Sequence, residues 1–302
     1  MNNNISSLIN DFLIHKRDVE NKRPKTCLAY KHDLKNTLLP FLSSQNIYNI
    51  SEVTQQDIER FLVYILNGSK TRSPANRNRK LATIQSFLEY LQSLNIPYDS
   101  SIHKIKAVKN YTKTITYLTE DEKEHLLEAV DNKATPHYKN RDLAILTLFL
   151  NTGIRVSELI NLQINDVQIH VKGESFIRIK RKGGNEAQLP IHSEALKALQ
   201  IYLSKRSAVN DSYIFLSRNN KHLEANSVYS LVKHYLNEAG IEKRKMGPHV
   251  LRHTFGVSLR RRGIDIATIQ QLLGHKKLET TSIYLNVESQ DLVKAVQSLL
   301  RR

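Results

Sequence analysis

The chain has 302 residues, of which 40% are hydrophobic, so it can bury an ordinary core, and its length suits two domains. Its single cysteine, Cys27, excludes an intrachain disulfide and a multi-cysteine zinc site. Because the chain contains no run of 18 apolar residues and residues 1–10 do not resemble a secretory signal, we expect a soluble, cytoplasmic protein without a membrane partner.

Positive charge is the strongest feature of the composition. The chain holds 45 Lys and Arg against 29 Asp and Glu, a formal net charge of +16. The excess is spread over the chain, with a net charge of +7 in residues 1–109 and +9 in the remainder. Both halves are therefore basic, which favours a two-sided grip on a polyanion such as nucleic acid. Ribosomal and membrane-surface proteins share such charge, so only the site chemistry distinguishes the classes.

Four helices are predicted in the first hundred residues, from apolar side chains spaced three or four residues apart. They are expected at residues 5–13, 24–41, 54–68 and 74–91. Pro24 and Pro74 suit the first turn of a helix, and Thr54 and Asp57 have the spacing of a capping box. The expected apolar faces are Ile5, Leu8, Ile9, Phe12 and Leu13; Leu28, Leu34, Leu38 and Leu39; Ile58, Phe61, Leu62 and Ile65; and Leu81, Ile84, Phe87, Leu88 and Leu91.

Basic residues gather where the fourth helix begins. They are Lys70, Arg72, Arg77, Arg79 and Lys80. A basic helix start is suited to phosphate oxygens, so these residues are candidates for DNA contacts; a solvated charged face is the alternative.

From residue 97 to residue 116 the helical period is lost and four lysines occur, so we expect an exposed basic linker and a domain boundary there. The predicted division is a helical domain at 1–109, a linker at 110–117 and a second domain at 118–302. In the second domain, Thr119 and Glu122 form another capping box, and a helix from about residue 138 ends at Gly153. Residues 167–191 alternate like short strands with a hairpin turn at Gly183-Gly184, and helices follow at 193–205 and 226–239. The expected fold class is mainly α with a small β-sheet.

The segment Thr152-Gly-Ile-Arg155-Val-Ser-Glu158 is predicted to place an arginine at a helix start. A guanidinium beside helix amino-terminal N–H groups suits an anionic oxygen, and Glu158, one turn later, is placed to hold it. A surface Arg-Glu pair is the alternative. In the predicted hairpin, Lys182 is the candidate general acid that protonates a leaving alkoxide, although a lysine beside glycine is often only solubilising.

Two further segments complete the set. His249 and Arg252, three residues apart on a predicted helix, share a face and are able to bind one phosphate, whereas His253 points elsewhere and is expected to make a structural hydrogen bond. His275 precedes Tyr284 by nine residues, and Tyr284 is one of 13 tyrosines, most of which are expected in the core. Taken together, these residues supply cations around a phosphodiester and a phenol to attack it.

The ordered set Arg155, Lys182, His249-x-x-Arg252, His275 and Tyr284 resembles the tyrosine recombinase (phage integrase) family, most nearly its Xer-like members. The resemblance is detailed over residues 119–287, and the first domain resembles the helical core-binding (SAM-like) module in helix number and charge only. One departure is Lys180-Arg-Lys182-Gly-Gly, where the family usually has a Gly-Lys-Gly-like turn, so Lys180 competes for the role of Lys182.

The resemblance implies a two-domain DNA clamp that breaks and rejoins strands through a 3′ phosphotyrosine at Tyr284. Arg155 and Arg252 are then expected to neutralise the phosphate, His249 and His275 to hydrogen-bond it, His249 to accept the phenolic proton and Lys182 to protonate the leaving oxygen. No cofactor and no metal are implied. A type IB topoisomerase and a non-catalytic DNA-binding accessory protein are the alternatives.

The implied partner is double-stranded DNA with inverted half-sites, bound by a homotetramer or together with a partner recombinase or accessory proteins. Beyond residue 288 an apolar stripe predicts a terminal helix that docks on a neighbouring protomer or on its own domain. Integration, excision and resolution all use this set of residues, and the sequence does not distinguish them.

Overall fold

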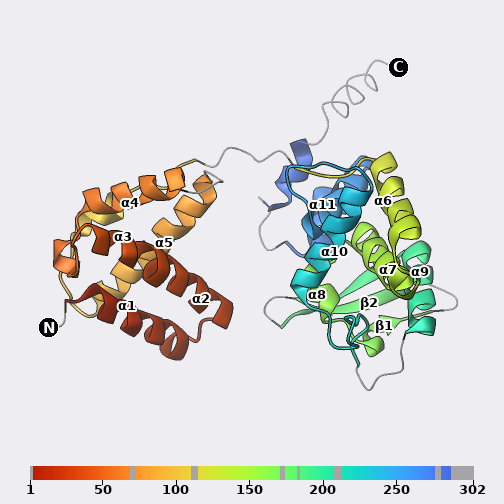
Figure 1. The fold of residues 1–302 in the computed structure, drawn as a ribbon, viewed down its shortest axis with the longest axis horizontal. Coiled ribbons are helices and arrows are strands. Elements are labelled where there is room, and N and C mark those ends of the chain that lie inside the picture. The colour runs from red at the N-terminus through yellow and green to blue at the C-terminus, as the bar shows by residue number, and fades with distance from the viewer. Residues whose placement is uncertain are drawn as a thin grey trace, which may run out of the picture. The chain divides into compact units, whose positions relative to one another are not determined.

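The computed structural model describes residues 3–68, 73–109, 115–170, 174–181, 184–206, 212–275 and 280–286 (Figure 1). The chain divides into two compact units, residues 1–112 and residues 113–302, each with its own hydrophobic core. Most of the described residues are helical, and one small antiparallel sheet lies in the second unit, so the predicted fold class is confirmed.

Helices make up most of the described part of unit 1. Its helices are α1 (Ile5–Ile14), α2 (Pro24–Asp33), α3 (Leu39–Ser44), α4 (Gln55–Gly68) and α5 (Pro74–Ser93). Two π-helical turns extend α1 and join α2 to α3, and short 3-10 helices lie at Ile50–Glu52 and Ser100–Lys104. Thr54 and Asp57 exchange the hydrogen bonds of a capping box before α4.

The core of unit 1 is built from the predicted apolar faces, with one exception. Phe12 and Phe87 meet edge to face with ring centroids 5.5 Å apart. Leu28 was expected in this core, but 63% of its surface is exposed. Leu28 precedes the buried Leu34 by six residues, which on a helix of 3.6 residues per turn places it about a third of a turn away from the buried face.

The expectation that residues 97–116 are exposed is wrong for part of that range, because two of its residues belong to unit 1's core. Ile102 and Ile105 are buried in its core. The short 3-10 helix brings these two residues, three apart, onto one side, a pattern too brief to register as a helical period.

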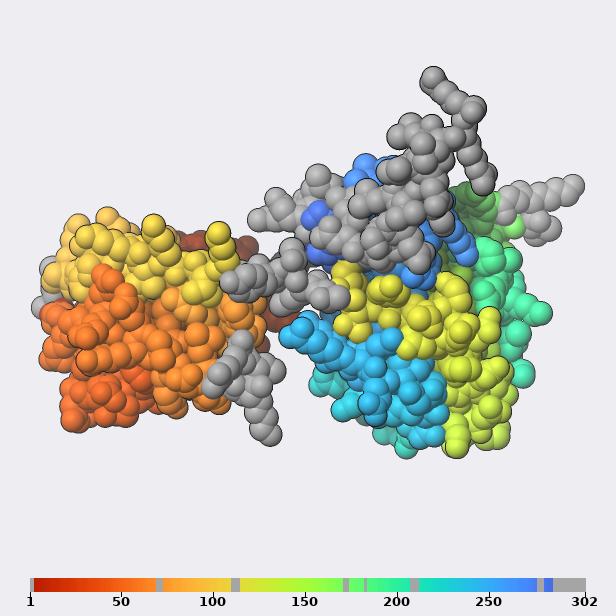
Figure 2. Space-filling view, turned by 90° about the horizontal axis from the view of Figure 1, so that it is seen from above, coloured from red at the N-terminus to blue at the C-terminus, as the bar shows by residue number. Residues whose placement is uncertain are grey.

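Unit 2 surrounds a central helix. Its elements are α6 (Glu120–Lys133), α7 (Pro136–Thr152), α8 (Val156–Ile160), β1 (Val167–Gln168), β2 (Ser175–Lys180), β3 (Glu186–Ile191), α9 (Ser193–Lys205), α10 (Ala225–Glu238), α11 (Pro248–Arg261) and α12 (Ile266–Leu273), followed by a 3-10 turn at Ser282–Asn286. Helix α7 packs against α6, α9 and α11 and is buried on most of its circumference. Figure 2 shows α6 (yellow) beside the light-blue segment that contains α10, in agreement with the contacts between these two helices.

The three strands pair in the order β1-β2-β3, all antiparallel. Ile177 and Ile179 of β2 are buried, and Lys180, which is exposed, pairs with Glu186 of β3. The hairpin closes where Arg181 N donates to Asn185 O at 2.8 Å and Gly184 N donates to Arg181 O at 3.1 Å. Gly184 has a φ of +86°, which a glycine adopts without strain.

Candidate active site

The carboxyl end of α12 is where the predicted site residues gather. Gly274 ends the helix in the left-handed conformation, with a φ of +61°. Carbonyl groups in the last turn of a helix have no partner within it, so they are available to donors from other elements. Two of the predicted arginines, one directly before α8 and one on α11, donate to them.

Arg155 immediately precedes α8 and faces this helix end. Its Nη2 donates to Gly274 O at 2.7 Å, and its Nη1 donates to Glu158 Oε1 at 2.7 Å. Glu158 Oε2 also accepts from the Arg155 backbone N at 2.8 Å, so one buried carboxylate holds both the helix start and the guanidinium. Gly153, at the end of α7, has a φ of +59° and provides the sharp turn into this segment.

Arg252 lies on α11 and is the more buried of the two arginines. Its Nη1 donates to Gly153 O and its Nη2 to Leu273 O. Burial, and secondly the charge of Arg155, lower the pKa of Arg252 to about 10. The buried guanidinium of Arg252 and the partly exposed one of Arg155 therefore form a cationic centre, whose repulsion an anion would relieve.

His249 lies one helical turn before Arg252, on the same helix. Burial and the charges of Arg252, Lys245 and Arg155 lower the pKa of His249 below its usual value. Its ring lies 6.4 Å from that of Tyr229, measured between centroids.

His275 directly follows Gly274, and its Nδ1 lies 2.9 Å from Thr281 Oγ1. Burial, and then Arg252, lower the pKa of His275 to about 4, so the imidazole is neutral at pH 7. Its ring stacks on that of Tyr284, with an interplanar angle of 3° and centroids 6.4 Å apart. A neutral histidine thus borders the face of the predicted nucleophile.

Tyr284 is buried, with 1% of its surface exposed. Its hydroxyl lies 3.0 Å from Nδ1 of His253, and burial raises the pKa of Tyr284 to about 12. The ring rests on α11 at Gly256, where an added Cβ would lie 2.6 Å from Tyr284 Cζ. In this arrangement the phenol is protonated and packed in the small cluster formed with Val257, Ile269 and Leu273.

His253 was expected to point away from the site, and this prediction is wrong, because its Nδ1 lies 3.0 Å from the Tyr284 hydroxyl. Burial, followed by the nearby His249, lowers its pKa to about 4. The sequence offered one signal, a glycine at position 256, one helical turn after His253; in the structure the Tyr284 ring packs against that glycine.

The hairpin contributes Arg181 to the site. The predicted acid, Lys182, lies outside the described residues, whereas its competitor Lys180 is exposed and pairs in the sheet with Glu186. Arg181 was not a candidate, yet its guanidinium reaches the same end of α12 as Arg155 and Arg252. Chain order gave no indication of this contact, which spans 90 residues.

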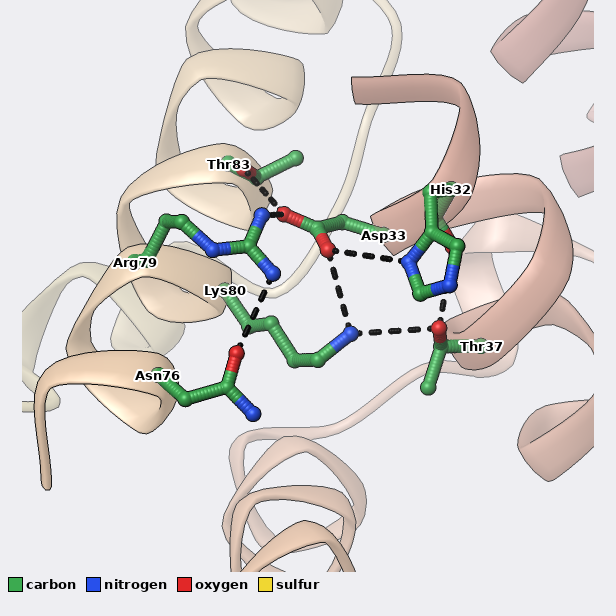
Figure 3. Close-up of polar contacts among 7 residues, drawn as sticks. All are labelled: His32, Asp33, Thr37, Asn76, Arg79, Lys80 and Thr83. Carbon is green, nitrogen blue, oxygen red and sulfur yellow. Dashed lines mark hydrogen bonds and ion pairs between the residues drawn. The ribbon is translucent and has the colours of Figure 1, made fainter. Parts of the chain in front are cut away.

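The candidate DNA contacts of unit 1 differ in their surroundings (Figure 3). Lys80 is 4% exposed, and its Nζ donates to Asp33 Oδ1 and to Thr37 Oγ1, both at 3.1 Å. Arg79 also donates to Asp33, but 47% of its side chain is exposed. Its other Nη donates to Asn76 Oδ1 at 3.1 Å. Arg79 is thus held at the surface, whereas the Lys80 ammonium lies inside the unit.

Arg77 lies in the first turn of α5 and contacts the last described residues of unit 1. Its Nη1 donates to Lys106 O at 3.3 Å, and the neighbouring Asn78 exchanges two hydrogen bonds with the backbone of Val108. Lys70 and Arg72 lie outside the described residues.

The arrangement in unit 2 fits an anion with a tetrahedral phosphorus rather than a metal ion. Two arginines and three neutral histidines supply donors around a phenol, and Glu158 is occupied by Arg155. Within the described ranges no group of three or more His, Cys, Asp or Glu side chains is placed to hold a metal. Nor is any helix in that part of the chain long and apolar enough to cross a membrane.

Known proteins resemble this chain over nearly its whole length. The model described as "Phage integrase family" matches residues 116–291, and the one described as "Phage integrase, N-terminal SAM-like domain" matches residues 9–94. A tyrosine recombinase XerC of Caldanaerobacter subterraneus subsp. tengcongensis is 31% identical, and the alignment covers 96% of this chain and 85% of that relative. A tyrosine recombinase XerC of Thermodesulfovibrio yellowstonii is also 31% identical, with 96% and 95% covered.

Solved structures with the same fold include DNA complexes. The post-cleavage complex of the XerH site-specific recombinase with a palindromic difH substrate has a TM-score of 0.79 at 23% identity, with 96% of this chain and 84% of that chain covered. A lambda integrase dimer bound to a COC′ core site has a TM-score of 0.71 at 19% identity, with 91% and 96% covered.

Proposed function

This chain belongs to the phage integrase family and is a tyrosine recombinase, a DNA strand transferase, and on that premise we propose that it cleaves and rejoins DNA through a 3′ phosphotyrosine at Tyr284. The observation that carries the proposal is the gathering of Arg155, Arg252, His275 and Tyr284 around one helix end. These residues come from three separate stretches of sequence, and a phenol that only filled the core would not require two guanidiniums beside it.

The scissile phosphate is proposed to bind at Arg155 and Arg252. A phosphodiester that approaches two guanidiniums accepts bidentate hydrogen bonds, and its charge offsets the burial and, secondly, the repulsion from Arg155 that lower the pKa of Arg252. One such preorganised contact contributes roughly 3 to 4 kcal/mol to lowering the barrier. The same negative charge raises the pKa of His249 and His275, which then donate to the phosphate.

Strand cleavage follows when the Tyr284 oxygen attacks phosphorus. The phenolic proton passes to an imidazole, for which His249 is the proposed base, and His253 is the group that holds the hydroxyl before DNA arrives. The bond from phosphorus to the 5′ oxygen breaks, and Lys182 protonates that oxygen. The phosphotyrosine conserves the energy of the broken bond, so a 5′ hydroxyl of another strand can reverse the reaction without a cofactor.

The DNA is proposed to carry inverted half-sites, and the active assembly is proposed to be a tetramer joined through the segment beyond residue 287. Relatives of this fold occur as a dimer on a core site and on a palindromic substrate, which supports paired half-sites. The terminal helix predicted beyond residue 288, with Leu292, Val296, Leu299 and Leu300 as its apolar stripe, lies outside the described residues. We place the protein in the cytoplasm, where it has access to DNA.

A nicked half-site whose short cut fragment diffuses away tests the proposal, with EDTA present throughout. The unaltered protein is expected to form a covalent protein-DNA band, and Tyr284→Phe to bind DNA without forming it. Tyr202→Phe is the matched control, because Tyr202 is also buried in unit 2 but donates to Ile214 O. Binding without any covalent band would favour the accessory-protein alternative, and relaxation of plasmids that lack paired sites would favour the topoisomerase alternative.

A further inference from the structure

Three guanidinium groups, not two, bind the carboxyl end of α12. Arg181, the residue directly before Lys182, donates from Nη1 to Gln271 O at 3.0 Å and from Nη2 to Leu272 O at 2.8 Å. Arg252 and Arg155 bind the next two carbonyls, those of Leu273 and Gly274. Four consecutive carbonyls at the end of α12 therefore accept from guanidiniums of other elements, and Gln271 O also accepts from Gly274 N.

The contact of Arg181 with this helix end is close. Gly274 has no side chain, and a Cβ at that position would lie 2.5 Å from Cζ of Arg181. Nε of Arg181 is buried without a hydrogen-bond partner. Burial, and secondarily Arg155, lower the pKa of Arg181, whereas Glu158 opposes that shift. A guanidinium in such a place is held by its two carbonyl bonds and its packing, at a cost in solvation.

The backbone of Arg181 also closes the hairpin. Its N–H donates to Asn185 O and its carbonyl accepts from Gly184 N, as described above. Side chains alternate along β2, so Arg181 follows the buried Ile179 on the side of the core, while Lys180 faces solvent. A single residue thus joins the end of the strand, the turn and the end of α12.

We propose that Arg181 is a positioning residue that tethers the β2–β3 hairpin to α12 and so fixes the point from which Lys182 extends. The inference rests on the proposed function, in which Lys182 protonates the leaving 5′ oxygen. A general acid must lie within hydrogen-bond reach of its acceptor, and a displacement of about 1 Å can cost roughly a hundredfold in rate. Because Arg181 directly precedes Lys182 in the chain, holding Arg181 on α12 fixes where the Lys182 backbone begins.

Cleavage of matched substrates separates positioning of the acid from other roles. One nicked half-site carries the ordinary 5′ oxygen and the other a bridging 5′ sulfur, which leaves as a thiolate without needing a proton. Arg181→Ala is expected to cleave the oxygen substrate roughly tenfold to a hundredfold more slowly than the unaltered protein. On the sulfur substrate it should come within about threefold of the unaltered rate. The double variant with Lys182→Ala should be no slower than Lys182→Ala alone.

Arg178→Ala is the matched control, because Arg178 lies on the same strand and bonds to Asp166 Oδ1 at 3.2 Å, away from α12. It should cleave both substrates at the unaltered rate. If Arg181→Ala does not fold, Arg181→Met keeps the apolar stem against Gly274 and removes the donors. Hydrogen exchange measures the tether itself: peptides covering 174–181 and 184–191 should exchange faster in the Arg181 variant and be unchanged in Arg178→Ala.

Equal slowing on both substrates, an unaltered rate on the oxygen substrate, or unaltered hairpin exchange would each overturn the role of Arg181. If sulfur fails to rescue Lys182→Ala, the acid is another group and Arg181 does not act through Lys182, although the recombinase assignment stands. If the unaltered protein forms no covalent band with either substrate, the proposed function itself fails, and the role of Arg181 fails with it.

Discussion

Replacing Asp33 by alanine is expected to destabilise unit 1 more than any single change to the cations around it. The side chains of Asp33 and Lys80 are 1% and 5% exposed, so the pair is buried (Figure 3). Without the carboxylate, the Lys80 ammonium keeps only the hydroxyl of Thr37. An uncompensated buried charge of this kind costs about 3 to 5 kcal/mol, a large part of the stability of an ordinary domain.

The opposite truncation should cost less. In Lys80→Met the carboxylate of Asp33 still accepts from Arg79 and from Thr83 Oγ1, the latter at 3.1 Å. We expect a loss of about 1.5 to 3 kcal/mol, the value of a hydrogen bond to a charged group. Arg79→Ala removes a half-exposed partner and should cost below about 1 kcal/mol. The double variant Asp33→Ala with Lys80→Met should be more stable than Asp33→Ala alone, because no buried charge is left unpaired.

Hydrogen exchange resolved to peptides of α2 and α5 is the suitable assay, since the chain has no tryptophan and unit 1 must be followed separately from unit 2. The exchange rates of the slowest amides give the free energy of unfolding of the unit. A loss below about 1 kcal/mol for Asp33→Ala, or a double variant as unstable as that single variant, would refute the reasoning from the buried pair.

Three further outcomes concern unit 2. Gly256→Ala places a methyl group 2.6 Å from the Tyr284 ring and should displace it, which would appear as a changed rate of covalent adduct formation with unchanged DNA binding. Burial lowers the pKa of His253 and of His275 from 6.5 to about 4, so between these pH values the unfolded chain binds more protons than the folded one. The urea concentration at the midpoint of unfolding should therefore fall as the pH drops from about 6.5 to about 4. A midpoint that does not change with pH would contradict the burial of these rings. Gly153→Ala forces a side chain into the left-handed region and against a phenylalanine ring 2.5 Å away, so thermal unfolding should show a loss of about 2 to 4 kcal/mol.

Local features of the fold were predictable from the sequence. Interactions within a few residues set two helix starts, at Pro24 and Thr119, and one helix end, at Gly153. The structure has all three where they were expected. The prediction that Leu28 is buried was wrong, because periodicity gives the spacing of apolar residues but not which of them define the buried face. Ile102 was missed because one 3-10 turn is too short to show a period.

Contacts between distant segments of the candidate site could not be predicted from the sequence. The sequence supplied Arg155, Arg252 and Tyr284 as a set, but contacts between distant segments decide which groups touch. The bond between His253 and Tyr284 joins residues 31 apart, and the bonds of Arg181 to α12 span about 90 residues, so neither leaves a local pattern. The sequence therefore predicted His249 as the base for the Tyr284 proton, whereas the histidine that contacts the phenol is His253.

The capped end of α12 also bears on when conformational entropy is lost. An arginine side chain gives up rotamer freedom of roughly 2 kcal/mol when it is fixed. Arg155 and Arg252, the two proposed to bind the phosphate, are fixed on backbone carbonyls by the fold itself. That cost is incurred when unit 2 folds, so a bound phosphate exchanges one oxygen acceptor for another instead of ordering two mobile side chains, and more of the contact energy remains for binding.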